Sequence, residues 1–141
     1  MLFRKCAGGI VFFTDQVFLL QTDKKEWVLP KGAIRSSSFP SEVALKRVKE
    51  ETGIQAEIIG PAGETSYEFY SFSRQQPVCN QITWFLMRSK SSDSQVAQSE
   101  GFINGGFFPI DEALEQITYS QEKSLVRISY HKMKKLLEIG A

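Results

Sequence analysis

Residues Gly32–Ile54 read GAIRSSSFPSEVALKRVKEETGI, and this stretch decides the fold. Pro40 suits the first position of a helix, because the N–H that proline lacks would have no helical partner there. Ala44 and Val48 lie four residues apart, which places both on one face of that helix. Gly53 is a natural end, because glycine readily adopts the left-handed conformation that terminates many helices. The stretch therefore predicts a helix with one buried face.

A second face of this helix carries charge. Arg47, Glu50 and Glu51 are related by spacings of three and four residues, so their side chains project on one side. Two carboxylates there are suitable ligands for a divalent cation that also binds waters and phosphate oxygens. Arg47 can neither ligate a cation nor act as a base, because its guanidinium has no free acceptor and stays protonated. The face therefore combines two candidate metal ligands with one fixed cation.

The sequence on either side of this helix is rich in β-branched and aromatic residues, which favour strands. Ala7–Phe13 and Val17–Gln21 are apolar runs around a polar turn, which is typical of a hairpin, and a short segment, Trp27–Leu29, ends at a proline. Further strands are expected at residues 55–59, 65–72, 80–88 and 102–108, a mobile surface loop at 89–99, and helices at about 110–117 and 121–138. This order predicts the α/β (α+β) class, with a mixed sheet and helices on its faces.

Length and composition indicate one folded domain, which we expect to span residues 1–141. Hydrophobic residues make up 42% of the chain, enough to fill a single core, and this excludes disorder as the main state. Lys and Arg number 17 and Asp and Glu 16, a formal net charge of +1, so global charge does not support binding to RNA or to a membrane. Any electrostatic recognition must therefore be local.

The two cysteines and the apolar runs bear on the cellular compartment. Cys6 and Cys79 lie far apart, and neither has a histidine or a second cysteine at ligand spacing, which argues against a zinc site. The longest apolar and small-residue run, Cys6–Phe13, is too short for a membrane helix, and Gly8 and Gly9 interrupt any resemblance to a secretory signal. We therefore expect a cytoplasmic protein with free thiols, with a single disulfide as the alternative.

Residues 32–54 also resemble a known family pattern, the Nudix box, which runs Gly, five residues, Glu, seven residues, then Arg-Glu-U-x-Glu-Glu-x-Gly-U with U aliphatic. The positions that match it at the required spacing are Gly32, Val48, Glu50, Glu51, Gly53 and Ile54. The segments Ala7–Gly9, Trp27–Pro30 and Phe107–Ala113 are typical surroundings of that box. The resemblance implies the Nudix fold, in which a mixed curved β-sheet is sandwiched between helices.

Three positions depart from the box, and they bear on catalysis. Its first Glu falls on Ser38, its Arg on Lys46, and the Glu after that Arg falls on Arg47. In the family that last Glu is usually a metal ligand and sometimes the base. The resemblance therefore implies Mg²⁺ or Mn²⁺ held by Glu50 and Glu51, both candidate catalytic residues, but the departures leave open whether metal binding and catalysis are lost.

Three interpretations of Arg47 compete. It bridges Glu50 or Glu51 where a metal ion would lie, or it points at substrate phosphate and supplies positive charge, or it is an ordinary solvated charge. We favour the first interpretation, because such ion pairs form along a helix without any ligand.

A further acid elsewhere is a candidate replacement for the missing carboxylate. Family members often carry a catalytic Glu on a later strand or loop, and here Glu64, Glu68 and Glu100 are available. Relatives often have an acid before the Phe-Phe-Pro segment, where this chain has Asn104 followed by two glycines. Glu100 lies just upstream, so we take it as the third candidate catalytic residue.

Within the superfamily, the chain looks most like the dinucleoside polyphosphate hydrolases of the diadenosine tetraphosphate type. In those proteins a lysine near the box contacts phosphate, a role that Lys31 matches by position. Aromatic residues stack on adenine in that class, which makes Tyr119 one candidate wall and Tyr67 or Tyr70 the other. Ordinary packing is an equally good interpretation of each tyrosine.

Two functional hypotheses remain. The first is a hydrolase of nucleoside polyphosphates in which water attacks phosphorus, Mg²⁺ held by Glu50 and Glu51 stabilises charge, and Lys31 orients phosphate. The second is a nucleotide- or RNA-binding protein that kept the fold and lost the chemistry, as Arg47 and Asn104 suggest. A basic face on the last predicted helix could steer polyphosphate or RNA, but an ordinary solvated face is the interpretation that we favour.

Overall fold

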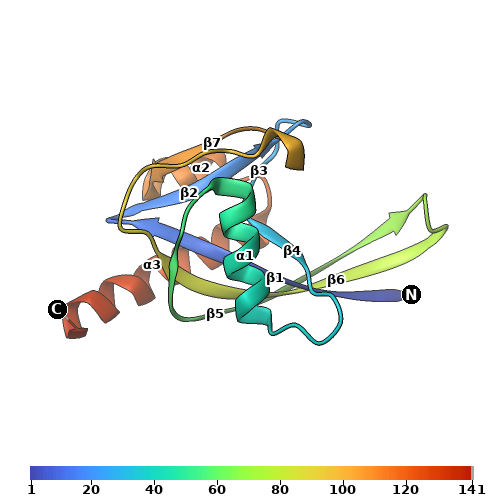
Figure 1. The fold of residues 1–141 in the computed structure, drawn as a ribbon, viewed down its shortest axis with the longest axis horizontal. Helices are drawn as coiled ribbons and strands as arrows, with labels where there is room; N and C mark the ends of the chain where they lie inside the picture. The colour runs from blue at the N-terminus through green and yellow to red at the C-terminus, as the bar shows by residue number, and fades with distance from the viewer. Residues whose placement is uncertain (141) are drawn as a thin grey trace.

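The computed structural model describes the backbone of residues 1–140 and the side chains of residues 1–137. One mixed sheet has helices on both faces (Figure 1). Its strands are β1 Leu2–Phe13, β2 Gln16–Thr22, β3 Trp27–Val28, β4 Lys31–Ala33, β5 Glu57–Ser71, β6 Gln76–Arg88 and β7 Phe102–Pro109. The helices are α1 Pro40–Thr52, α2 Ile110–Gln116 and α3 Ser120–Gly140, and a single 3₁₀ turn spans Gln98–Glu100.

Strand β1 lies at the centre of the sheet. It pairs in parallel with β6 along its whole length, from Leu2 opposite Val78 to Phe12 opposite Arg88. On its other side β1 pairs with β2 only next to their shared turn, at Phe12 and Phe13. Nearer its N-terminus, at residues 6–8, β1 pairs with β4 instead, so β1 and β2 diverge. Strand β5 is antiparallel to β6, and β3 and β7 are both antiparallel to β2. This curved, mixed sheet confirms the predicted fold class.

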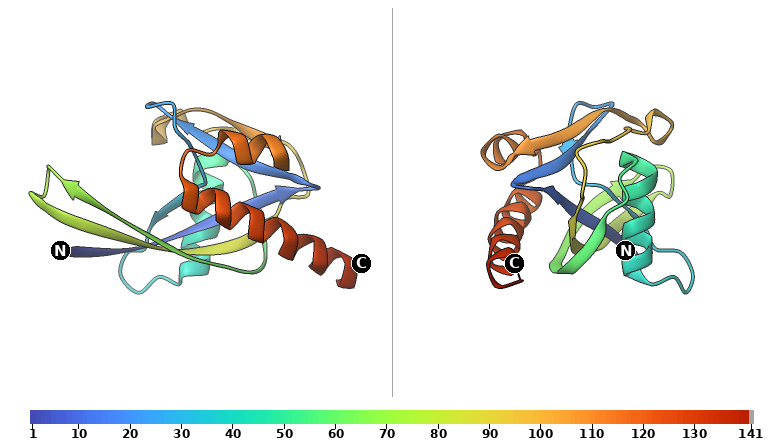
Figure 2. Two further views of the ribbon diagram at one scale, coloured as in Figure 1. Left: turned by 180° about the vertical axis from the view of Figure 1, so that it is seen from behind. Right: turned by 60° about the vertical axis from the view of Figure 1, so that its left-hand side comes forward.

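Alternating residues of the strands build a core on each face of the sheet, because successive strand side chains point to opposite sides. On one face Ile10 and Trp84 pack with α2 and α3, and both side chains are fully buried. On the other face Val11 and Met87 pack against Val48 of α1. Figure 2 shows α1 on one side of the sheet and α3 on the other, which is the predicted sandwich.

Helix α1 follows the sequence prediction. It begins at Pro40, and it ends at Gly53, whose φ of 74° is the left-handed conformation that glycine adopts without strain. Its buried face carries Ala44 and Val48, as the spacing predicts. The polar stretch after β6 lacks regular structure for most of its length but is tied to this helix end, because the N–H of Gln95 donates to the carbonyl of Thr52.

Two elements differ from the sequence prediction. The separate strands expected at residues 55–59 and 65–72 are one strand, β5, because register shifts near Gly60 and Gly63 absorb the turn-forming residues without ending the pairing with β6. Strand β4 was not expected, and it exists because Lys31–Ala33 pair with β1. Across the described residues, the structure has no helix with the length and apolar character to span a membrane.

Candidate functional site

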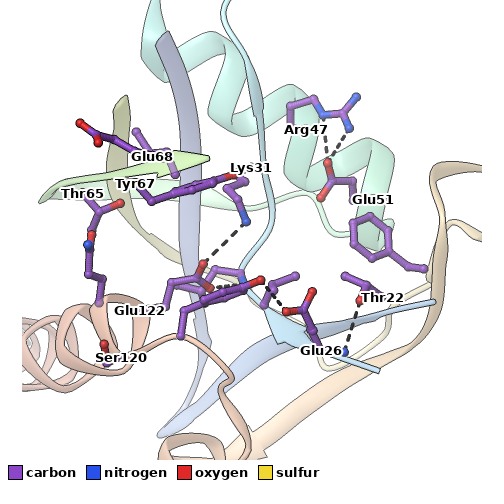
Figure 3. A pocket seen from close by; sticks show the side chains of 16 residues that line it. Thr22, Glu26, Lys31, Arg47, Glu51, Thr65, Tyr67, Glu68, Ser120 and Glu122 are labelled. Carbon is purple, nitrogen blue, oxygen red and sulfur yellow. Dashed lines mark hydrogen bonds and ion pairs between the residues drawn. The ribbon is translucent and has the colours of Figure 1, made fainter. Parts of the chain in front are cut away.

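A cavity of about 570 Å³ lies between α1, β5 and the beginning of α3 (Figure 3). Six of the residues singled out from the sequence line it: Lys31, Arg47, Glu51, Tyr67, Glu68 and Tyr119. Four others do not: Glu50, Glu64, Glu100 and Tyr70. The structure thus brings together residues from α1, β4, β5 and the loop before α3, which are far apart in the sequence.

At the α1 wall, Arg47 and Glu51 form the ion pair that the sequence analysis favoured. Nη2 of Arg47 donates to Oε2 of Glu51 at 2.6 Å, and Nε donates to the same oxygen at 3.0 Å. The stem of Arg47 lies across Gly32, where a β-carbon would approach Arg47 to 2.5 Å. Glycine at that position is therefore required for the guanidinium to reach Glu51.

Two more carboxylates approach the same guanidinium. Nη1 of Arg47 lies 3.7 Å from Glu50, and Nη2 lies 3.4 Å from Glu100. Both carboxylates are more exposed than Glu51, and Glu50 lines a separate hollow beside Gly53. The three acids proposed as catalytic from the sequence therefore gather around Arg47, but only Glu51 faces the main cavity.

Glu51 is the unusual carboxyl of this wall. It is only 1% exposed, and burial raises its pKa to about 7, although the Arg47 guanidinium opposes that rise. Its second oxygen, Oε1, is buried and has no hydrogen-bond partner among the described residues. A buried acceptor without a partner costs free energy, so a donor that reached this oxygen would relieve that cost.

Lys31 lies between the two ends of the cavity and is held from α3. Its Nζ is 3.7 Å from a carboxylate oxygen of Glu122, whose other oxygen accepts from the N–H of Leu29 at 2.8 Å. Burial raises the pKa of Glu122, while Lys31 acts in the opposite direction. In Figure 3 the amine of Lys31 points toward Glu122, so its positive charge is already engaged in the structure.

At the α3 end, the hydroxyl of Tyr119 donates to Oε2 of Glu26. This hydrogen bond and the nearby negative charge raise the pKa of Tyr119 to about 12. On the opposite wall, Asn80 donates to the hydroxyl of Tyr67 at 2.8 Å. Tyr70 lies further along β5, outside the cavity, and packs edge to face with Phe72.

The family model described as the NUDIX domain matches residues 2–127. This chain belongs to the Nudix family. Its curated relatives include "Putative mutator protein MutT4" of Mycobacterium tuberculosis (strain CDC 1551 / Oshkosh), which is 28% identical over 117 residues, or 81% of this chain and 45% of the relative. The Nudix chain thus spans less than half the length of that protein.

Two further likenesses fit the family. The RNA pyrophosphohydrolase of Sphingopyxis alaskensis is 26% identical over 114 residues, which cover 67% of this chain and 68% of that protein. The Ap4A hydrolase of C. elegans superposes with a TM-score of 0.71 at 20% identity, covering 94% of this Nudix chain and 99% of that one. The structural likeness establishes the fold alone.

Nudix hydrolases generally use a divalent metal ion such as Mg²⁺, which needs several oxygen ligands. The described part of the chain contains no group of three acid, histidine or cysteine side chains placed to hold a metal ion. The guanidinium of Arg47 occupies the space between the three carboxylates. Oε1 of Glu51 is the one carboxylate oxygen of Glu51 that Arg47 leaves unpaired. One oxygen ligand is too few to hold Mg²⁺, so the site as arranged does not fit the metal.

Two carboxylates of the cavity were missed from the sequence, Glu26 and Glu122. Glu122 could have been found, because it lies four residues before Val126 on the buried side of α3, where a carboxylate needs a partner. Glu26 has no such signal, since it stands in a polar turn beside two lysines. Only the contact with Tyr119 identifies it as part of this Nudix site.

Proposed function

We propose that this Nudix chain binds nucleoside polyphosphates, including dinucleoside polyphosphates, in the cavity between α1, β5 and α3. We further propose that it hydrolyses a pyrophosphate linkage within them only slowly. The observation that carries the proposal is the Arg47–Glu51 ion pair at the wall of a cavity that also contains Lys31. The family and the names of its relatives support pyrophosphate hydrolysis as the reaction type.

Phosphate binding follows from the two cations of the cavity. Lys31 and Arg47 come from β4 and α1, and both side chains line the cavity while retaining part of their exposure to solvent. Ammonium and guanidinium groups form strong, charge-assisted hydrogen bonds to phosphate oxygens. Both cations are paired with carboxylates in the structure, so a polyphosphate must compete with Glu122 and Glu51 for them.

Slow hydrolysis follows from the acids. Water that attacks phosphorus must lose a proton, and a carboxylate with a pKa near 7 suits that role at neutral pH. Glu51 meets this requirement, lines the cavity, and has one oxygen without a hydrogen-bond partner among the described residues. Arg47 engages its other oxygen and stands where the family has a carboxylate, so the charge stabilisation that a metal ion supplies in relatives is weakened here.

The test is a comparison of three proteins: the wild type, Arg47→Glu and Arg47→Gln. Diadenosine tetraphosphate is incubated with each in the presence and absence of Mg²⁺ or Mn²⁺, the nucleotide products are separated by ion-exchange chromatography, and metal binding is titrated by calorimetry. Arg47→Glu restores the carboxylate, so metal affinity and metal-dependent hydrolysis should both rise by about tenfold or more. Arg47→Gln removes the cation without adding a ligand and should show no such gain.

Equal behaviour of the two variants would contradict the role assigned to Arg47. Hydrolysis by the wild type at the rate of Arg47→Glu would contradict the proposal of slow catalysis.

A second candidate function is binding of a nucleotide or RNA without hydrolysis. It is favoured by the position of Arg47 between Glu50, Glu51 and Glu100, where its fixed charge replaces that of an ion. Nucleotide binding by the wild type that needs no divalent cation, combined with the absence of products, would support this function over the first. Binding of a short RNA in preference to free nucleotide would identify RNA as the ligand.

A further inference from the structure

One end of the cavity contains hydrogen-bond acceptors that the proposed phosphate binding does not use. Glu26, Tyr119 and Glu122 line the same cavity as Lys31 and Arg47. Figure 3 shows Glu26 and Glu122 below the Arg47–Glu51 pair, with Lys31 pointing toward Glu122. A nucleotide whose phosphates are held by Lys31 and Arg47 would therefore have Glu26 and Tyr119 within the same cavity for its base. We call the surface formed by Glu26 and Tyr119 the Glu26 subsite.

The backbone around this subsite is fixed before any ligand arrives. Trp27 and Thr118 are joined reciprocally, because the N–H of Trp27 donates to Oγ1 of Thr118 at 2.8 Å and the N–H of Thr118 donates to the carbonyl of Trp27 at 3.1 Å. Glu26 and Tyr119 are the residues next to this pair in the chain. On its other side Glu26 accepts from the N–H of Thr22 through its carbonyl at 2.8 Å. The subsite is thus preorganised, which lowers the entropic cost of binding.

The tyrosine ring and the carboxylate offer different contacts. Tyr119 is 46% exposed, so part of its ring is accessible to a flat apolar group such as a nucleobase. Its hydroxyl is committed to Oε2 of Glu26, and Oε1 of Glu26 accepts no hydrogen bond from the residues that the structure describes. An ionised carboxylate only accepts, so Glu26 requires N–H donors from its ligand.

Among purines this requirement separates guanine from adenine. The Watson–Crick edge of guanine carries an N1–H and a 2-amino group side by side, which a carboxylate accepts together. The same edge of adenine carries one amino group and an unprotonated N1, whose lone pair is repelled by a carboxylate. A carboxylate that pairs with two N–H groups disfavours an analogue that offers only one, because the carboxylate then gives up bound water without an equivalent partner.

We propose that Glu26 is a specificity-determining residue that selects guanine over adenine in the Glu26 subsite, with the base stacked on Tyr119. This inference rests on the nucleotide binding proposed above. Glu122 is not the base-reading carboxylate, because its two oxygens already face Leu29 and Lys31.

The experiment measures dissociation constants by calorimetry for methylene-bridged analogues of GTP and ATP, which are not cleaved at the bridge. The proteins are the wild type, Glu26→Gln and a control, Glu112→Gln, which removes an exposed carboxylate on α2. The wild type and the control should bind the guanine nucleotide about tenfold more tightly than the adenine nucleotide, as expected for one bidentate base contact. Glu26→Gln should lose this preference mainly by weaker guanine binding, while Tyr119→Phe should reduce it less.

The outcomes separate this inference from the proposed function. Equal binding of both nucleotides to the wild type, or an unchanged guanine preference in Glu26→Gln, would overturn the role of Glu26 and leave nucleotide binding intact. Binding of neither nucleotide to a wild type that is folded by circular dichroism would overturn both. If Glu26→Gln fails to fold, the wild type is titrated with methylene-bridged analogues of GTP and ITP. ITP lacks the 2-amino group of guanine, so the inference predicts weaker binding of the ITP analogue. Equal affinities for the two analogues would overturn the inference.

Discussion

The two ends of the cavity both join a carboxylate to a donor, but over very different distances along the chain. At the α1 end Arg47 and Glu51 are four residues apart on one helix, whereas at the α3 end Tyr119 and Glu26 are 93 residues apart. The first pair is enforced by helix geometry, and the second exists only because β3 and the loop before α3 are hydrogen-bonded together. The α1 end is therefore the part of the site that sequence patterns reveal, and the α3 end is the part that they hide.

Burial also differs between the two carboxylates. Glu51 is almost fully buried and has a raised pKa, whereas Glu26 is half-buried at the mouth of the cavity. Burial of Glu51 therefore carries a free-energy cost that depends on pH, so stability should respond to pH mainly through the α1 end.

The pH dependence of stability should report on Glu51. Its pKa of about 7 in the folded protein exceeds its ordinary value of 4.5, so the folded state keeps a proton that the unfolded state releases. Between these two values the free energy of unfolding should fall as pH rises, by about 3 kcal/mol in total. Urea unfolding at pH 5 and pH 7.5 measures this change, and Glu51→Gln, which is neutral at both, should remove it.

Glu122 also has a raised pKa and contributes in the same direction. The contribution of Glu51 is therefore the change in unfolding free energy between the two pH values in the wild type minus the same change in Glu51→Gln. Identical pH profiles of the two proteins would show that Glu51 titrates in the folded state as it does in the unfolded chain.

Arg47→Ala should destabilise the fold by about 2 kcal/mol at pH 8.5, because an ionised Glu51 is then buried without its partner. The loss should shrink at pH 5.5, where Glu51 takes up a proton instead. Chemical unfolding at both pH values measures the effect. Lys46→Ala is the matched control, since Lys46 is exposed on the same helix, and it should change stability by less than about 0.5 kcal/mol. Equal losses for Arg47→Ala at the two pH values would contradict the buried-pair account.

Lys31→Met should weaken binding of a methylene-bridged ATP analogue about tenfold, as expected for the loss of one charge-assisted hydrogen bond. Lys31 pairs with Glu122 rather than with Glu26, so the preference for guanine over adenine should persist in this variant. Calorimetry measures the affinity, with Lys46→Met as the control for general charge. Unchanged affinity in Lys31→Met would place the phosphates elsewhere in the cavity.

Local patterns predicted most of the secondary structure. Pro40 and Gly53 bracket α1 as expected, and alternating apolar residues predicted β1 and β2. The sequence predicted two strands where the structure has the single strand β5. Glycines such as Gly60 and Gly63 are typical of turns, but here the long partner strand β6 keeps both within the sheet. Pairing between strands of that kind depends on the tertiary structure, so local sequence patterns do not predict it.

For the site, the sequence by itself determined the α1 wall: which residues share a helix face, that Arg47 replaces a carboxylate, and that an ion pair with Glu51 is available. The physical reason is that side chains three and four residues apart meet on any α-helix. Only the tertiary structure decided that Tyr70 points away, that Glu122 holds Lys31, and that Glu26 meets Tyr119. Those relations depend on how strands and helices distant in the chain pack together, and no spacing within the sequence encodes them directly.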